Sequence, residues 1–199
     1  MEHVPFFSIL VPVYNMSGKL DRCVSSIKAQ TFVDYEVIFV DDGSTDRSYD
    51  ELCAIAAGDA RCKVIRHDRN RSLLCARYTG MENAAGKYIF FLDSDDCITP
   101  DALESLYAHI AKDPADIIRF GFTTYSGSYT YSPTVSEDPF GDFCRGKEAP
   151  GIWKNCISSA TVKKAVAEIT PFYCNSGEDT FMSCTLYYYA KSFSRLDRQ

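Results

Sequence analysis

Continuous apolar stretches alternate with amphipathic segments over the first 122 residues. The apolar stretches are rich in Val, Ile and Phe and predict strands buried on both faces, at 7–13, 35–40, 63–67, 88–92 and 116–122. Between them, apolar residues recur at helical spacing and predict helices at 17–30, 46–57, 71–85 and 99–110, the last beginning with Thr99 and Pro100. Strands that alternate with helices imply right-handed crossovers. The predicted fold is α/β, a mostly parallel central sheet with helices on both faces.

The pattern becomes irregular after residue 122. The segment 123–151 is rich in Ser, Gly, Pro and aromatic residues, with a strand predicted at 129–134. Helices are predicted at 153–168 and 178–190, and a last strand at 192–196. We therefore expect a single domain over 1–199, with a regular half at 1–122 and an irregular half at 123–199.

Composition places the chain among ordinary globular proteins. Its 199 residues are 46% hydrophobic and 24% charged, which excludes disordered and collagen-like classes. The formal net charge is −6 and the sequence contains no dense Lys/Arg stripe, which argues against a nucleic-acid partner. No apolar run reaches the roughly 20 residues that span a bilayer. The segment 1–7 is too short and polar for a secretory signal.

The nine cysteines are an odd number and form no Cys-x-x-Cys pair. This spacing gives no support for a zinc or redox site and favours reduced, buried thiols. We therefore expect a cytoplasmic protein, with peripheral association at the inner face of the membrane compatible with the sequence.

Polar residues follow three of the predicted strands. The first strand runs into Tyr14 and Asn15, the second into Asp41 and Asp42, and the fourth into the segment 93–96, Asp-Ser-Asp-Asp. Ligands of open parallel sheets bind outside the carboxyl ends of the strands. The sequence therefore predicts a binding site where these three strand ends meet.

Asp93 and Asp95, two residues apart in the 93–96 segment, are the clearest indication of a binding site. Residues two apart in an extended segment point the same way, so Asp93 and Asp95 can face one point. Two such charges about 4 Å apart repel by roughly 4 kcal/mol at an effective dielectric near 20, and a cation reverses that cost. Oxygen ligands favour Mg²⁺ or Mn²⁺. The alternative is a solvated turn in which Asp96 or Thr99 caps the next helix.

The second strand end is also ambiguous by itself. Asp42 followed by Gly43 is a turn signal, and Asp46 can cap the following helix. A carboxylate at this position can instead accept a hydrogen bond from the N–H of a nucleotide base, while Tyr14 offers a face on which a base can stack.

These segments together resemble family 2 glycosyltransferases, which have the nucleotide-diphospho-sugar transferase fold called GT-A. The matching segments are 8–15 (SILVPVYN), 36–46 (EVIFVDDGSTD), 76–77 (AR), 86–96 (GKYIFFLDSDD) and, more weakly, 178–179 (ED). The resemblance implies a catalytic domain, here truncated at its C-terminus, with nucleotide-sugar binding in 1–122 and the acceptor side in 123–199.

The resemblance also implies roles for single residues. Those expected to bind the donor are Pro12 and Tyr14 at the nucleoside, Asp42 at the base edge with Asp41 beside it, Asp93 and Ser94 near the ribose, and Arg77 near the phosphates. Asp95, with Asp93, would coordinate a divalent cation on the donor diphosphate. Asp179 is the candidate general base and Glu178 its alternate; helix-capping acids are the structural alternative for this pair.

The implied activity is that of a hexosyltransferase-type enzyme. It would transfer a sugar from a nucleotide-diphosphate sugar, expected to be a UDP-sugar, to the hydroxyl of a saccharide or lipid-linked acceptor, with inversion and in a metal-dependent reaction. Cell-surface polysaccharide or glycoconjugate synthesis is the expected context. The acceptor is expected to lie over 123–175, where the candidate stacking aromatics are Phe140, Phe143, Trp153 and Tyr173.

Some positions depart from the family pattern. Ser72 stands where a glycine is common, and Tyr78 where an asparagine is frequent. The late histidine that some members place on the metal is absent, as is the Gln-x-x-Arg-Trp signature of processive members, so a polymerising synthase is not expected.

Three other functions share parts of this pattern. The main alternative is a non-catalytic nucleotide-sugar-binding module, which would keep Tyr14 and Asp42 but lack a productive base. A phosphoacceptor receiver domain would carry its acidic pair after the first strand, whereas here the pair follows the second. A sugar nucleotidyltransferase would need a glycine-rich, basic loop after the first strand, and 15–19 (NMSGK) is a poor version of one.

Overall fold

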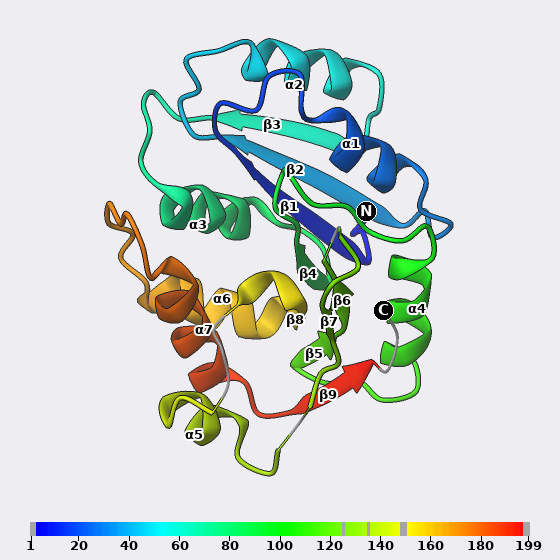
Figure 1. The fold of residues 1–199 in the computed structure, drawn as a ribbon, viewed down its shortest axis with the longest axis vertical. Coiled ribbons are helices and arrows are strands. Elements are labelled where there is room, and N and C mark those ends of the chain that lie inside the picture. Colours follow the sequence, from blue (N-terminus) through cyan, green and yellow to red (C-terminus); the bar gives the residue numbers. More distant parts are fainter. Residues whose placement is uncertain (1–2, 125, 135, 148–150, 197–199) are drawn as a thin grey trace.

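The chain folds around one seven-stranded sheet, flanked by helices on both faces (Figure 1). The computed structural model describes residues 3–124, 126–134, 136–147 and 151–196. The strands of the sheet, in spatial order, are β3 (Cys62–Arg66), β2 (Tyr35–Asp41), β1 (Phe7–Val13), β4 (Tyr88–Phe91), β8 (Asn155–Ser158), β5 (Ile117–Phe120) and β9 (Phe193–Leu196). The main helices are α1 (Asp21–Lys28), α2 (Ser48–Ala57), α3 (Leu73–Asn83), α4 (Ala102–Ile110), α6 (Ser159–Glu168) and α7 (Glu178–Tyr189).

Strand pairing confirms the mostly parallel sheet that the alternating pattern predicts. β1 pairs in parallel with β2 and β4, β2 with β3, and β5 with β9. β8 is antiparallel to both of its neighbours, β4 and β5. Because β8 and β9 lie in the same sheet as β1–β5, the regular and irregular halves of the sequence share one framework.

The helix predicted over 153–168 is wrong for the first part of that segment, which contains β8. Only residues 159–168 of that segment are α-helical; a short 3₁₀ turn, η1 (Ile152–Lys154), and β8 precede them. The side chain of Ser158 caps α6 by accepting a hydrogen bond from the backbone N–H of Thr161, at 3.3 Å. The strand forms because it satisfies backbone groups of two neighbouring strands at once, and short-range periodicity carries no sign of such pairing.

α4 begins at Ala102, three residues later than the helix predicted from Thr99. The carbonyls of Thr99 and Pro100 are used in other contacts: Thr99 accepts hydrogen bonds from Ala102 N at 3.0 Å and Gln30 Nε2 at 2.7 Å, and Pro100 from Thr31 N at 2.9 Å. The segment before α4 is therefore a loop bound to the end of α1. α1 is likewise shorter than the helix predicted over 17–30.

Two apolar clusters fill the two faces of the sheet. Because strand side chains alternate, Ile9 and Val11 of β1 pack with α1, α2 and α4, whereas Leu10 packs with α3, α6 and α7. All three side chains are buried. Continuous burial along β1 and β2 explains why their sequences are uninterrupted apolar runs.

The remaining elements lie in the irregular half. β6 (Phe122–Thr123) and β7 (Thr130–Tyr131) form a two-stranded antiparallel sheet, and α5 (Pro139–Cys144) is a short helix that packs on α7. All nine cysteines are free thiols. Within the described ranges, no helix combines the length and hydropathy needed to cross a membrane.

Candidate functional site

The carboxyl ends of β1, β2 and β4 meet at one edge of the sheet, as the sequence predicts. Val13 lies opposite Asp41 in the β1–β2 register, and Asp42 N donates a hydrogen bond to Val13 O at 2.8 Å. On the other side of β1, Leu92 N donates to Leu10 O at 3.0 Å. The three polar segments after these strands therefore share one rim.

The loops after β1 and β2 hold each other in place. Asn15, whose φ is 53°, donates its backbone N–H to Ser44 Oγ at 3.0 Å and accepts from Thr45 N through Oδ1 at 2.9 Å. Pro12 is buried. Tyr14 is 45% exposed, so its ring is accessible at the rim and can stack on a planar ligand.

Asp42 anchors the loop that precedes α3. Its buried carboxylate lies 2.6 Å from His67 Nδ1 and accepts backbone hydrogen bonds from Arg71 N and Ser72 N, both at 2.9 Å. Sequence reasoning missed this role, because nothing near Asp42 in the sequence indicates its partners 25 to 30 residues away. The contact of Asp42 with a nucleotide base stays a prediction.

Asp41 lies beside Asp42 and is fully buried. Its Oδ2 is 3.2 Å from Arg66 Nε, and its Oδ1 accepts from Ser44 N at 3.3 Å. The next residue, Gly43, has φ +68°, and a Cβ there would lie 2.3 Å from the backbone carbon of Arg69. Glycine is therefore required at this turn.

Arg77 lies between the two acidic segments of the candidate site. The side chain extends from α3 and is 2% exposed; its Nη2 donates to Asp93 Oδ1 at 2.9 Å and its Nη1 to Asp179 Oδ1 at 2.5 Å. Burial lowers the pKa of Arg77, but the charges of Asp93 and Asp179 outweigh it and raise the pKa above its usual value. The guanidinium therefore stays charged and joins the two carboxylates, so its terminal nitrogens face protein groups.

The segment 93–96 forms a tight turn at the end of β4, in which Asp96 N donates to Asp93 O at 3.0 Å. Arg22 of α1 donates to the carbonyl of Asp95, whose side chain is exposed. Ser94 is buried. Burial, together with the charges of Asp95 and Asp93, raises the pKa of Asp96 above its usual value, so the acidic side chains of this turn are close enough to repel one another.

The sequence predicts a divalent cation at the acidic turn. Among the residues that the structure describes, no group of three or more His, Cys, Asp or Glu side chains is arranged to hold a metal ion. Mg²⁺ in nucleotide-dependent enzymes is commonly bound by one or two carboxylates, with water and substrate phosphates completing the shell. Asp93 and Asp95, whose charges already crowd Asp96, supply ligands of that kind.

Glu178 and Asp179 form the first turn of α7, after Gly177 with φ 84°. Both side chains are partly exposed, and Asp179 is the one that contacts Arg77. The tertiary structure thus brings Asp179 and Asp93 onto one guanidinium, although they are far apart in the sequence.

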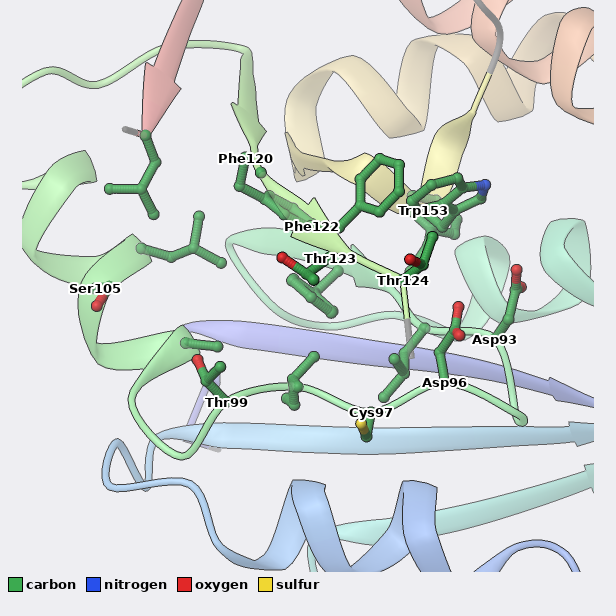
Figure 2. Close-up of a pocket in the computed structure, with 18 residues that line it drawn as sticks. Asp93, Asp96, Cys97, Thr99, Ser105, Phe120, Phe122, Thr123, Thr124 and Trp153 are labelled. Carbon is green, nitrogen blue, oxygen red and sulfur yellow. The ribbon is translucent and has the colours of Figure 1, made fainter. Parts of the chain in front are cut away.

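A cavity of about 610 Å³ opens beside the acidic turn (Figure 2). Asp93 and Asp96 line one end of it, and β4, the loop 97–99, α4, β5 and β6 supply most of the rest. Of the four aromatic residues proposed for the acceptor, Trp153 lines this cavity. The other three lie elsewhere: Phe143 packs on Tyr187, Phe140 on Tyr188, and Tyr173 is exposed.

Comparisons with known proteins find relatives of this chain in sequence and in structure. The sequence profile described as Glycosyl transferase family 2 matches residues 8–169. A Bacillus subtilis protein, "Uncharacterized glycosyltransferase EpsJ", is 38% identical over 135 residues, which are 67% of this chain and 39% of EpsJ. The Streptococcus pneumoniae "Glycosyltransferase GlyA" is 38% identical over 121 residues, which are 61% of this chain and 17% of GlyA.

A solved structure shows the same fold. The crystal structure of S. aureus TarS 1-349 in complex with UDP-GlcNAc matches with a TM-score of 0.81 at 22% identity, over 98% of this chain and 56% of that one. The chain therefore has the fold of the GT-A glycosyltransferases but spans well under two thirds of the length of these relatives. Since the family profile covers most of the chain, this protein belongs to glycosyl transferase family 2.

Proposed function

We propose that the protein transfers a sugar from a UDP-sugar to the hydroxyl of a saccharide or lipid-linked acceptor, with inversion at the anomeric carbon. The observation that carries this proposal is the bridge from Asp93 through Arg77 to Asp179. It joins the strand end where a donor diphosphate is expected to an accessible carboxylate on a different element. A transferase that uses a general base needs such a pairing.

The donor is assigned to the rim formed by β1, β2 and β4. Tyr14 is exposed there and would stack on the base, while the buried Asp42 and Asp41 would hold the loops that flank the base edge. Ser94 and Asp93 follow at the ribose. The choice of UDP is supported by the TarS complexes, which hold UDP-GlcNAc and UDP.

Asp179 is assigned as the general base. It would remove the proton of the acceptor hydroxyl while the oxygen attacks the anomeric carbon and the nucleotide diphosphate leaves from the opposite face. Arg77 holds one carboxylate oxygen of Asp179, which fixes the direction of the other. Glu178, in the same helical turn, remains the alternate base.

Asp95 and Asp93 are the residues that would hold a Mn²⁺ or Mg²⁺ ion. A divalent cation bound there supplies Lewis-acid stabilisation of the charge on the departing diphosphate. The cation would also stabilise the acidic turn, because its positive charge offsets the repulsion among the carboxylates.

The wider setting belongs to the same proposal. We assign residues 1–122 to the donor half and 123–199 to the acceptor half of one catalytic domain. The reaction would serve cell-surface polysaccharide or glycoconjugate synthesis. It would take place in the cytoplasm, at the inner face of the membrane, because nucleotide sugars and lipid-linked acceptors meet there.

A thermal-shift panel of nucleotide-diphosphate sugars, with and without Mn²⁺, tests the proposal. A ligand that binds only the folded state stabilises it by about 2.7 kcal/mol at 100 times its Kd, so a donor gives a selective rise in Tm. We expect the rise with a UDP-sugar in Mn²⁺ and, with a suitable acceptor, release of UDP. A Tm rise without any transfer or hydrolysis would favour the non-catalytic binding module, and no rise with any donor would reject both functions.

A further inference from the structure

The cavity beside the acidic turn has no role in the proposed donor site. It lies over the α4 face of the sheet, between α4 on one side and β6 on the other. Asp93 and Asp96 lie at one end, and Ser105 and Phe120 at the opposite end (Figure 2). The cavity therefore begins at the proposed reaction centre and leads away from it.

The chemistry of the lining changes along this direction. The lining beyond the acidic end is mainly apolar. Its larger part is Phe90, Phe91, Leu92, Ile98, Ala102, Leu106, Phe120, Phe122, Trp153 and Leu196, and the remaining residues are Cys97, Thr99, Ser105, Gly121, Thr123 and Thr124. Phe90 and Phe120 stack at 5.2 Å between ring centroids, and Trp153 packs edge-on against Phe122 at 4.6 Å. These contacts give the cavity rigid aromatic walls.

Such a lining selects an apolar ligand over a sugar ring. Each sugar hydroxyl buried without a partner would cost about 1–3 kcal/mol, whereas apolar surface gains about 25 cal/mol per Å² when it leaves water. Thr123 and Thr124 line the middle of the cavity (Figure 2), and Leu106 and Leu196 add aliphatic surface to its lining. A volume of about 610 Å³ is within the 300–1,000 Å³ range of ligand pockets.

We propose that this cavity binds the hydrocarbon chain of a lipid-linked acceptor. The hydrocarbon would lie between α4 and β6. The sugar attached to it would lie at the acidic end, where the acceptor hydroxyl would face Asp93 and Asp179. This assignment rests on the proposed transferase function, and it narrows the acceptor from saccharides in general to those that carry an aliphatic group.

Trp153 makes the proposal directly measurable, because it is the single tryptophan of the chain and lines the cavity. We would titrate the protein with octyl β-glucoside, kept below its micelle concentration, and follow tryptophan fluorescence. Methyl β-glucoside, with the same sugar and no alkyl chain, is the matched ligand. We expect a saturable change with the octyl glycoside and at least a tenfold weaker response with the methyl glycoside.

A pair of variants localises the binding. Ala102→Phe places a ring in the cavity from the first turn of α4, and Ala108→Phe makes the same change on an exposed position of that helix. We expect Ala102→Phe to weaken octyl glycoside binding at least tenfold and Ala108→Phe to leave it unchanged. Thermal melts check that both fold; if Ala102→Phe does not fold, the comparison of the two glycosides decides alone.

Three results would overturn the proposal: no saturable response to the octyl glycoside, equal responses to both glycosides, or full binding by a folded Ala102→Phe variant. The second result would assign the cavity to the sugar itself. Because the titration contains no donor, it is independent of the thermal shift with UDP-sugars. Failure of that donor test with a positive titration would reject the transferase assignment and keep the apolar site.

Discussion

Arg77 and Asp179 are 102 residues apart in the sequence, yet their side chains meet with Nη1 2.5 Å from Oδ1. The other terminal nitrogen of the same guanidinium contacts Asp93. A planar guanidinium can serve two carboxylates at fixed angles, which a single ammonium group cannot do. Arg77 thus sets how the start of α7 lies relative to the end of β4.

Replacing Arg77 with Lys tests this positioning. The Lys ammonium keeps the charge but loses the fork, so we expect kcat to fall by about 10²-fold while the KM for the donor changes only a few-fold, since small misplacements of reacting groups carry costs of that order. Steady-state kinetics measure both values. The control is Arg71→Lys, an exposed arginine in the loop before α3. Equal losses in both variants would contradict a special role for Arg77.

The assignment of the base predicts that Asp179→Asn lowers transfer by about 10²–10⁴-fold and leaves donor affinity nearly intact. Asparagine keeps an oxygen that can accept from Arg77, so the fold at the start of α7 should persist. Initial rates of UDP release and donor titrations give the two values. Glu178→Gln is the matched control, and a large loss in that variant with turnover retained in Asp179→Asn would transfer the role to Glu178.

The cation site predicts that Asp95→Ala abolishes the Mn²⁺-dependent part of donor binding. The exposed carboxylate is removed without disturbing a buried contact, so Tm without ligand should stay close to that of the parent protein. Thermal shifts with a UDP-sugar, with and without Mn²⁺, measure the effect. Asp50→Ala removes an equal charge from the exposed side of α2, and an identical response of the two variants would refute the assignment of Asp95.

Ser72 has a backbone conformation that suits glycine, with φ 89° and ψ 158°. Such a conformation costs a residue with a side chain about 1–3 kcal/mol. Its hydroxyl accepts from Cys174 N at 3.2 Å, and both Ser72→Gly and Ser72→Ala lose that contact. We therefore expect Ser72→Gly to be more stable than Ser72→Ala by about 1 kcal/mol or more in urea unfolding. The opposite order, which is usual elsewhere in proteins, would show that the backbone is unstrained.

The lowered pKa of Glu36 in the folded protein predicts that stability depends on pH. Burial raises the pKa of this carboxyl, but hydrogen bonds from Lys63 Nζ at 2.7 Å, Ser8 Oγ at 2.7 Å and Ala85 N at 2.8 Å outweigh it and lower the pKa below its usual value. The folded state thus binds the Glu36 proton less tightly than the unfolded state. The resulting stability is present above the unfolded pKa of about 4.3 and is lost as pH falls through the folded value.

We therefore expect the free energy of unfolding of the parent protein to fall between about pH 5 and pH 3, and to fall less steeply in Glu36→Gln, because glutamine has no proton to take up. Urea unfolding at a series of pH values measures the slopes. Glu137→Gln changes an exposed carboxyl and should keep the parent slope. A slope in Glu36→Gln as steep as that of the parent would show that other carboxyls govern the acid transition.

Much of the framework was predictable because it depends on local pattern. Continuous apolar runs identified β1 and β2, and the helical spacing of apolar residues located α2 and α3 to within about two residues. The parallel order of these elements then placed the acidic strand ends at one edge of the sheet. Membership of the family, which the matching segments implied, is confirmed by the profile over residues 8–169.

Long-range contacts decided what the pattern could not show. The sequence by itself determined that carboxylates gather at the strand ends, because strand direction and side-chain alternation are local properties. Only the tertiary structure decided that β8 inserts antiparallel between β4 and β5, that Asp42 anchors the loop before α3, and that Arg77 reaches Asp179. Each of these depends on partners about 25 to 100 residues away, which are chosen by burial and hydrogen-bond satisfaction in the folded chain and leave no trace in short-range periodicity.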